Sequence, residues 1–147
     1  MEIKELGHVV LYVTNIQESA DFYRDTLGFK EILRQGTVAA FSSGRTHHEL
    51  LLIEVGGEKQ EKHLPRPGLY HIGFKIGDGH DAIEDVWKEL KAKGVAVSGT
   101  GDHGVTHSIY ITDPDGNELE LYADIGDAWK KDPKAILAAT KPLHLEV

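Results

Sequence analysis

Apolar and polar residues alternate in several short runs of this chain, which is the pattern of strands with one buried face. Two of these runs, residues 6–13 and 69–76, resemble each other closely. Each has a histidine as its third residue, His8 in the first run and His71 in the second, 63 residues apart (71 − 8). Packing alone does not readily explain a histidine at the same place in both copies. The pattern therefore predicts a duplicated structural unit in which the two histidines have a role.

The repeat continues into a predicted helix after each of these strands. Asn15 is followed by Glu18, and Asp81 is followed by Glu84, which is the pattern of a capping residue at the start of a helix. The two starts are 66 residues apart (81 − 15). Glycines at positions 28 and 94, again 66 apart (94 − 28), predict where the two helices end, because glycine accepts the left-handed conformation there.

Further apolar runs predict three more strands in each half, at residues 29–34, 38–42, 48–55, 95–98, 108–112 and 118–122. Each half therefore reads β-α-β-β-β, which predicts an α+β fold of two paired modules. The modules cover about residues 5–55 and 68–125, joined by a linker at 56–67. Together they form one domain at 1–126, followed by a C-terminal tail at 127–147 with a short helix near 135–139.

Strand alternation places three candidate metal ligands on the same kind of face. His8 and His71 lie opposite the apolar residues of their runs, and Glu120 lies opposite Leu119 and Leu121. The face with the candidate ligands is mixed in polarity, so it can line a cavity, whereas the apolar face can pack against the helices. Two imidazoles and one carboxylate leave coordination positions open for a substrate. The sequence therefore predicts a divalent metal held by His8, His71 and Glu120.

Composition narrows the class of protein without identifying it. The 147 residues are 40 % apolar and 27 % charged, as in an ordinary globular domain, and the net charge of −8 argues against a nucleic-acid partner. There is no cysteine, so neither disulfides nor thiolate ligands are available. No apolar run approaches membrane length, and the first residues do not have the pattern of a signal peptide. We therefore expect a cytoplasmic protein with no membrane partner.

Several motifs give the chain a family resemblance. Residues 102–105 (Asp-His-Gly-Val), 108–110 (Ser-Ile-Tyr) and 113–122, which open with the turn Asp-Pro-Asp-Gly, occur in this order, and a doublet of His47 and His48 opens an apolar strand. With the paired modules, these features resemble the vicinal oxygen chelate superfamily, which includes glyoxalases, bleomycin-resistance proteins and extradiol dioxygenases. The catechol 2,3-dioxygenase-like branch is the most similar.

The resemblance implies a curved mixed sheet around a metal cavity, the glyoxalase-like fold. It implies that His8, His71 and Glu120 bind Fe2+, with Mn2+, Ni2+, Zn2+ and Co2+ as alternatives. His48 would be the acid–base histidine and Tyr110 a tyrosine beside the substrate. The implied activity is an extradiol ring-cleaving dioxygenase that acts on a catechol-type small molecule and O2.

Two features leave other functions open. Dioxygenases of this type usually carry two tandem copies of the domain, and this chain has one, which predicts a homodimer. In glyoxalase-like or epimerase-like members a carboxylate near His48 is a fourth ligand, and here that residue would be Glu49. Alternation predicts that residues 51, 53 and 55 form the apolar face, which places His48 in the cavity and Glu49 away from it. A lyase or isomerase, or a small-molecule-binding resistance protein, are the alternatives.

The remaining histidines have weaker predicted roles. His107 has the same parity as Ile109, so it is expected to face away from the cavity. His103 lies in a glycine-rich loop and either covers the cavity or is solvated. His80 and His144 are expected to be surface residues.

Overall fold

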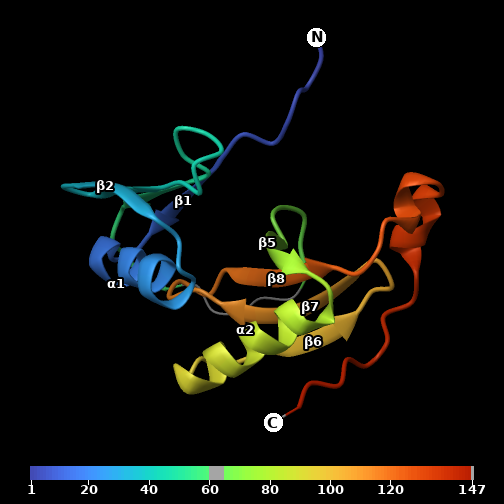
Figure 1. The fold of residues 1–147 in the computed structure, drawn as a ribbon. Helices are drawn as coiled ribbons and strands as arrows, with labels where there is room; N and C mark the ends of the chain where they lie inside the picture. Colours follow the sequence, from blue (N-terminus) through green and yellow to red (C-terminus); the bar gives the residue numbers. More distant parts are fainter. Residues whose placement is uncertain (60–64, 147) are drawn as a thin grey trace. The chain divides into compact units, whose positions relative to one another are not determined.

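The computed structural model describes residues 1–59 and 65–146 and divides the chain into two compact units. The first contains residues 1–62 with 114–116, and the second contains 63–113 with 117–147 (Figure 1). Residues 60–64 of the predicted linker lie outside the described residues. Within the described ranges, no helix is long and apolar enough to cross a membrane.

The first unit is a four-stranded sheet with one short helix. Its strands are β1 (Val9–Val13), β2 (Glu31–Gln35), β3 (Val38–Phe41) and β4 (Leu50–Glu54), in the order β1-β4-β3-β2. β1 runs parallel to β4, and the other neighbours are antiparallel. The helix α1 (Ile16–Asp21) continues directly into the π-helical turn η1 (Phe22–Thr26).

The second unit repeats this topology. Its strands are β5 (His71–Asp78), β6 (Gly99–Asp102), β7 (Thr106–Thr112) and β8 (Glu118–Asp124), in the order β5-β8-β7-β6. The first and last of these strands in the sequence, β5 and β8, are again the parallel pair. The helix α2 (His80–Ala92) follows β5, and the tail forms two short 3-10 helices, η2 (Ala128–Lys130) and η3 (Pro133–Leu137).

The predicted fold class is confirmed, because each half reads β-α-β-β-β and the described residues form two four-stranded mixed sheets. The strand predicted at 95–98 was wrong, since the strand β6 begins at Gly99. Two of its four residues are glycine, which has little strand propensity, and the backbone pairing of Gly99 with Tyr110 on β7 decides the position. The second helix begins at His80 and has Gly79 as its N-cap, with no side-chain capping hydrogen bond, so the cap predicted at Asp81 was wrong.

The helix-facing side of the second sheet is apolar, as alternation predicted. Ile109 and Ile111 on β7 and Leu119 on β8 are fully buried, and Ile83 and Leu90 are the buried residues of α2. Fully burying one such side chain contributes about 1.5–3 kcal/mol to folding. The opposite side of the sheet is therefore free to carry polar residues, including those that form the candidate site.

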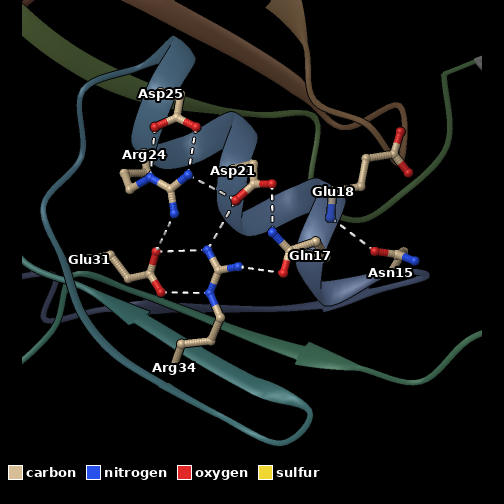
Figure 2. Close-up of polar contacts among 8 residues, drawn as sticks. All are labelled: Asn15, Gln17, Glu18, Asp21, Arg24, Asp25, Glu31 and Arg34. Carbon is tan, nitrogen blue, oxygen red and sulfur yellow. Dashed lines mark hydrogen bonds and ion pairs between the residues drawn. The ribbon is translucent and has the colours of Figure 1, made fainter.

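Hydrogen bonds and ion pairs between charged side chains connect α1 and η1 to β2 in the first unit (Figure 2). Arg34 donates two hydrogen bonds to the Glu31 carboxylate, at 2.6 and 2.8 Å, and reaches Asp21 on the helix at 3.3 Å. Arg24 joins Asp21 to Glu31 from the other side. Hydrogen bonds from Arg34 lower the pKa of Glu31, which favours the charged form of this carboxylate.

The first helix, α1, begins where the sequence predicts it. The side chain of Asn15 accepts a hydrogen bond from the backbone N–H of Glu18 at 2.9 Å, which satisfies one of the free donors at the first turn (Figure 2). Gly28 and Gly94 both adopt positive φ, at 73° and 68°, after the two helical segments. These local signals are therefore read correctly from the sequence.

Candidate metal centre

Glu120, in the middle of β8, is the centre of a polar cluster on the open side of the second sheet. Its Oε1 accepts a hydrogen bond from Ser108 Oγ at 2.6 Å and one from the Tyr110 hydroxyl at 3.1 Å. Its Oε2 lies 3.0 Å from Nε2 of His71. One carboxylate oxygen is thus held by β7, while the other is directed at β5. The structure brings together His71, Glu120 and Tyr110, three of the five residues predicted for the site.

The strand register explains why these side chains meet. Glu120 pairs with Tyr110 on one side and with Gly73 on the other. A Cβ at Gly73 would lie 3.6 Å from Glu120 Oε2 and 3.3 Å from the Tyr122 ring, so a larger side chain there would crowd the carboxylate. The absence of a side chain at Gly73 leaves the space between His71 and Glu120 open.

His71 and Glu120 are chemically suited to share a metal ion. Two donors that each lie about 2.0–2.2 Å from one divalent ion, at a right angle, are roughly 3 Å apart, and these two are 3.0 Å apart. The other ring nitrogen of His71, Nδ1, is buried without a hydrogen-bond partner among the described residues, and Glu118 lies 3.7 Å from it. A carboxylate near the distal nitrogen is the usual support for a metal-binding histidine. The donor set therefore fits a divalent metal.

A chain of hydrogen bonds leads away from Glu120 through Tyr110. Nε2 of His103 lies 2.8 Å from the Tyr110 hydroxyl, and the Thr140 hydroxyl lies 3.1 Å from Nδ1 of His103. Burial, and then the nearby Glu120 charge, raise the pKa of Tyr110, so its hydroxyl remains a hydrogen-bond donor at neutral pH. Sequence reasoning did not assign a role to Ser108 or Thr140 and left His103 open. The glycine-rich loop around His103 was the one available signal.

A depression of about 280 Å3, open to solvent, lies beside Glu120 within the second unit and is called the cavity below. Its lining includes Tyr122 on β8 and Thr106 on β7, and Trp129 and Ile136 from the C-terminal tail. The sequence indicated only a tail with a short helix at this end of the chain. In the structure, the two 3-10 helices of that tail supply an apolar wall to the cavity that Glu120 faces. The tail is therefore part of the candidate site.

The predicted residues of the first unit form a separate group. His8 lies just before β1 and is exposed, and its ring centre is 4.5 Å from that of His48. Nδ1 of His47 lies 2.7 Å from Nδ1 of His48. Partial burial, and then the neighbouring His47 and His8, lower the pKa of His48 and favour its neutral form. The catalytic role of His48 stays a prediction, but the ring contact with His8 is present.

The alternation predicted for β4 was wrong. Leu50 and Leu52 are its buried residues, at 1 % and 0 % exposed, whereas Val55 is 61 % exposed. Every residue from 50 to 53 is apolar, so the sequence pattern does not indicate which side of β4 is buried. The parallel pairing with β1 determines it. The alternation does not apply to His48, because this residue precedes the strand and lies in irregular backbone.

The register of the duplicated sheets shows which residues of the two units correspond to each other. In the second unit His71 pairs with Glu118, and Gly73 pairs with Glu120. In the first unit Val9 pairs with Leu50 and Val10 with Leu51, so residue 51 corresponds to Glu120 and residue 49 to Glu118. The first unit therefore has a leucine at the position that corresponds to the candidate ligand of the second.

The Glu49 carboxylate is bound within its own loop. It accepts hydrogen bonds from the Ser43 hydroxyl and, at 2.9 Å, from the Ser43 backbone N–H, and Arg45 lies 3.6 Å away. These contacts, led by the Ser43 hydroxyl, lower the pKa of Glu49. Over the described residues, no group of three or more histidine or acidic side chains is arranged to hold a metal ion. The complete set of His8, His71 and Glu120 stays a prediction.

Comparison with known proteins decides the family. Residues 5–121 match the family model of the Glyoxalase/Bleomycin resistance protein/Dioxygenase superfamily. The chain belongs to this superfamily. The resemblance inferred from the paired histidine strands is thereby confirmed, and so is the glyoxalase-type fold.

Relatives within the superfamily differ in activity. The chain is 31 % identical to Metapyrocatechase 2 of Cupriavidus necator over 96 % of its own length, but it spans only 43 % of that protein. It is 34 % identical to Metallothiol transferase FosB of Staphylococcus haemolyticus, over 82 % of the chain and 84 % of the relative. The crystal structure of a glyoxalase/dioxygenase from Nostoc punctiforme has the same fold, with a TM-score of 0.65, 22 % identity and coverage of 84 % of this chain and 92 % of that one.

Proposed function

We propose that this superfamily member is a non-haem Fe(II)-dependent extradiol dioxygenase that opens the ring of a catechol-type substrate with O2. The observation that carries the proposal is Leu51, which stands where the duplication would place a second ligand carboxylate. Without that carboxylate, His8, His71 and Glu120 would be the ligands of the metal, and such a set would leave coordination positions open for the substrate. The similarity to Metapyrocatechase 2 supports the same class of reaction.

The predicted residues would have different roles in this reaction. His8, His71 and Glu120 would hold the metal, which when bound supplies Lewis acidity toward the catechol oxygens and one-electron chemistry with O2. Ser108 and Tyr110 orient the Glu120 carboxylate through its Oε1. Both oxygen atoms of O2 enter the product, a ring-opened semialdehyde acid, so no further reductant is required.

Proton transfer is assigned to His48. Its lowered pKa keeps the imidazole neutral at pH 7, so it is able to accept a proton from a catechol hydroxyl and return it later in the reaction. Tyr110 remains protonated, and its hydroxyl would lie beside the substrate while its one hydrogen is donated to Oε1 of Glu120. The apolar side chains of Trp129 and Ile136 would contact an aromatic ring bound beside Glu120.

The test uses protein purified without oxygen and loaded with ferrous iron. Oxygen uptake and the yellow ring-opened product are followed with a panel of catechols. His48→Ala is expected to keep iron and to lose about 10²–10⁴ in rate, the usual contribution of an acid–base group. Glu49→Ala is the matched control and should alter neither the iron content nor the rate. Loss of iron in Glu49→Ala with full activity in His48→Ala would favour the glyoxalase-type reaction.

A metal-dependent thiol transferase is the second candidate. Its support is the match to Metallothiol transferase FosB, which covers 84 % of that relative rather than half of it. If iron-loaded protein cleaves no catechol while manganese- or nickel-loaded protein consumes a thiol in the presence of an electrophilic small molecule, this candidate replaces the dioxygenase. A lyase or isomerase of glyoxalase type would instead convert its substrate without consuming oxygen or thiol.

We further propose that the functional form is a homodimer. Each four-stranded sheet has two edge strands, β1 and β2 in the first and β5 and β6 in the second. Sheet edges in native proteins are usually covered or paired, because their free backbone groups otherwise promote aggregation. Light scattering at micromolar concentration is expected to give twice the mass of 16.2 kDa. A monomer would refute this proposal without affecting the metal ligands.

A further inference from the structure

Two histidines on the helix-covered side of the second sheet face each other through the same ring nitrogen. His80 is the first residue of α2, and His107 is on β7 with the parity of the buried Ile109. Their Nδ1 atoms are 2.9 Å apart, with the rings nearly perpendicular. The prediction that His80 is a simple surface residue therefore misses a contact. Because Ser108 and Glu120 point to the other side of the sheet, this pair is not part of the candidate metal centre.

Each of the two rings also has a carboxylate near its other nitrogen. Nε2 of His80 lies 3.4 Å from Glu84 one helical turn later, and Nε2 of His107 lies 3.6 Å from Asp102 on β6. The Asp102 oxygen concerned also accepts a hydrogen bond from the Gly104 backbone N–H. A carboxylate favours a proton on the nitrogen that faces it. Glu84 and Asp102 thus favour tautomers in which both Nε2 atoms carry hydrogen.

In those tautomers neither a hydrogen nor a cation separates the two Nδ1 atoms. A neutral imidazole carries a single hydrogen, so two rings protonated at Nε2 place two bare Nδ1 lone pairs 2.9 Å apart. If one ring instead carries its hydrogen on Nδ1, its bare Nε2 lone pair faces a carboxylate. That second arrangement gains an Nδ1–H···Nδ1 hydrogen bond but keeps one bare Nε2 facing a carboxylate, whereas a cation between the two Nδ1 atoms leaves both Nε2–H groups facing their carboxylates.

We propose that His80 and His107 form a second metal-binding point, distinct from the His71 and Glu120 centre, for a divalent transition metal of the Ni2+ or Cu2+ class. Two nitrogens that each lie about 2.0–2.1 Å from one ion at a right angle are about 2.9 Å apart, and right-angled nitrogen coordination is typical of these ions. Carboxylates behind both imidazoles are the support that metal-binding histidines usually have. Water would complete the coordination, since the His80 side chain is 38 % exposed.

A proton is the competing occupant of the same position. Burial is the main cause that lowers the pKa of His107, and the neighbouring His80 lowers it further, although Asp102 acts in the opposite direction. A metal bound at this point would link the first turn of α2 to β7.

Equilibrium dialysis with Ni2+ tests the proposal on the full chain at pH 7.5. His80→Gln and His107→Gln are each expected to bind one Ni2+ fewer per chain than the wild type. His144→Gln, which changes an exposed histidine of the tail, is the matched control and should bind as many as the wild type. His71→Ala should lose the other ion and keep this one, which separates the second point from the proposed function.

Nuclear magnetic resonance of the wild-type protein gives a second readout that does not depend on variants. Substoichiometric Ni2+, which is paramagnetic, is expected to broaden the side-chain signals of His80 and His107 together. The proposal is overturned if both signals remain sharp at one equivalent of Ni2+ beyond that bound by His71 and Glu120. It is also overturned if His80→Gln and His107→Gln bind as much Ni2+ as the control.

Discussion

Replacement of Ser108 by alanine tests the candidate metal centre most directly. The Ser108 side chain is fully buried, and its hydroxyl donates a 2.6 Å hydrogen bond to Oε1 of Glu120. Alanine removes this bond with little change in shape and leaves the Tyr110 hydroxyl, at 3.1 Å, as the remaining donor to that oxygen. The carboxylate would then be less firmly oriented toward His71, so we expect weaker metal binding.

The size of the effect follows from the charge of the acceptor. A hydrogen bond to a charged group contributes about 1.5–3 kcal/mol, and each 1.4 kcal/mol changes an equilibrium constant about tenfold. Ser108→Ala should therefore weaken metal binding roughly 10- to 100-fold, which is also the usual effect of removing a group that supports a metal ligand. Tyr110→Phe should have a smaller effect on affinity, because the shorter bond from Ser108 remains.

Competition with a chromophoric chelator under anaerobic conditions measures the affinity for Fe2+ and for Mn2+. Thr112→Ala is the matched control, because Thr112 lies on the same side of β7 but pairs with Glu118 rather than with Glu120. Thermal unfolding of the metal-free proteins should show that both variants remain folded. An affinity of Ser108→Ala within about twofold of the wild type, or an equal loss in Thr112→Ala, would refute the role assigned to the hydrogen bond.

Two further predictions concern stability. Leu52→Ala, in the core of the first sheet, should reduce the free energy of unfolding by about 2–5 kcal/mol in urea denaturation. Val55→Ala, at an exposed position, should change it by no more than about 0.5 kcal/mol. Equal effects of the two variants would contradict the observed buried face of β4. Hydrogen bonds from Arg34 lower the pKa of Glu31 below its ordinary value of 4.5 in the folded state. The stability that this ion pair contributes is therefore present above pH 4.5 and is lost as the pH falls through the folded-state pKa. Glu31→Gln should therefore be less stable than the wild type at pH 7, and acid titration followed by circular dichroism should show the difference shrinking below pH 4.5; a difference that is constant with pH would exclude the ion pair as its cause.

The sequence by itself determined the duplicated architecture and the two candidate ligand strands. These features depend on signals within a few residues of each other: strand alternation around His8 and His71, the cap at Asn15, and the glycines after each helix. Side-chain direction alternates along any strand, so the polar side of β7 and β8 could be assigned before their partners were known. The match to the superfamily confirms the resemblance and the fold, while the ligands on these strands stay a prediction.

The tertiary structure alone decided how the site is supported. Residues 50–53 are all apolar, so no local pattern distinguishes the two sides of β4, and the hydrogen-bonded register with β1 selected Leu50 and Leu52 as the buried pair. The hydroxyl of Ser108 lies 12 residues from Glu120 in sequence, and Thr140 lies 37 residues from His103. Such pairs meet only when strands and tail pack together, because burial and hydrogen bonding between distant segments depend on the whole arrangement and not on the residues next to them in the chain.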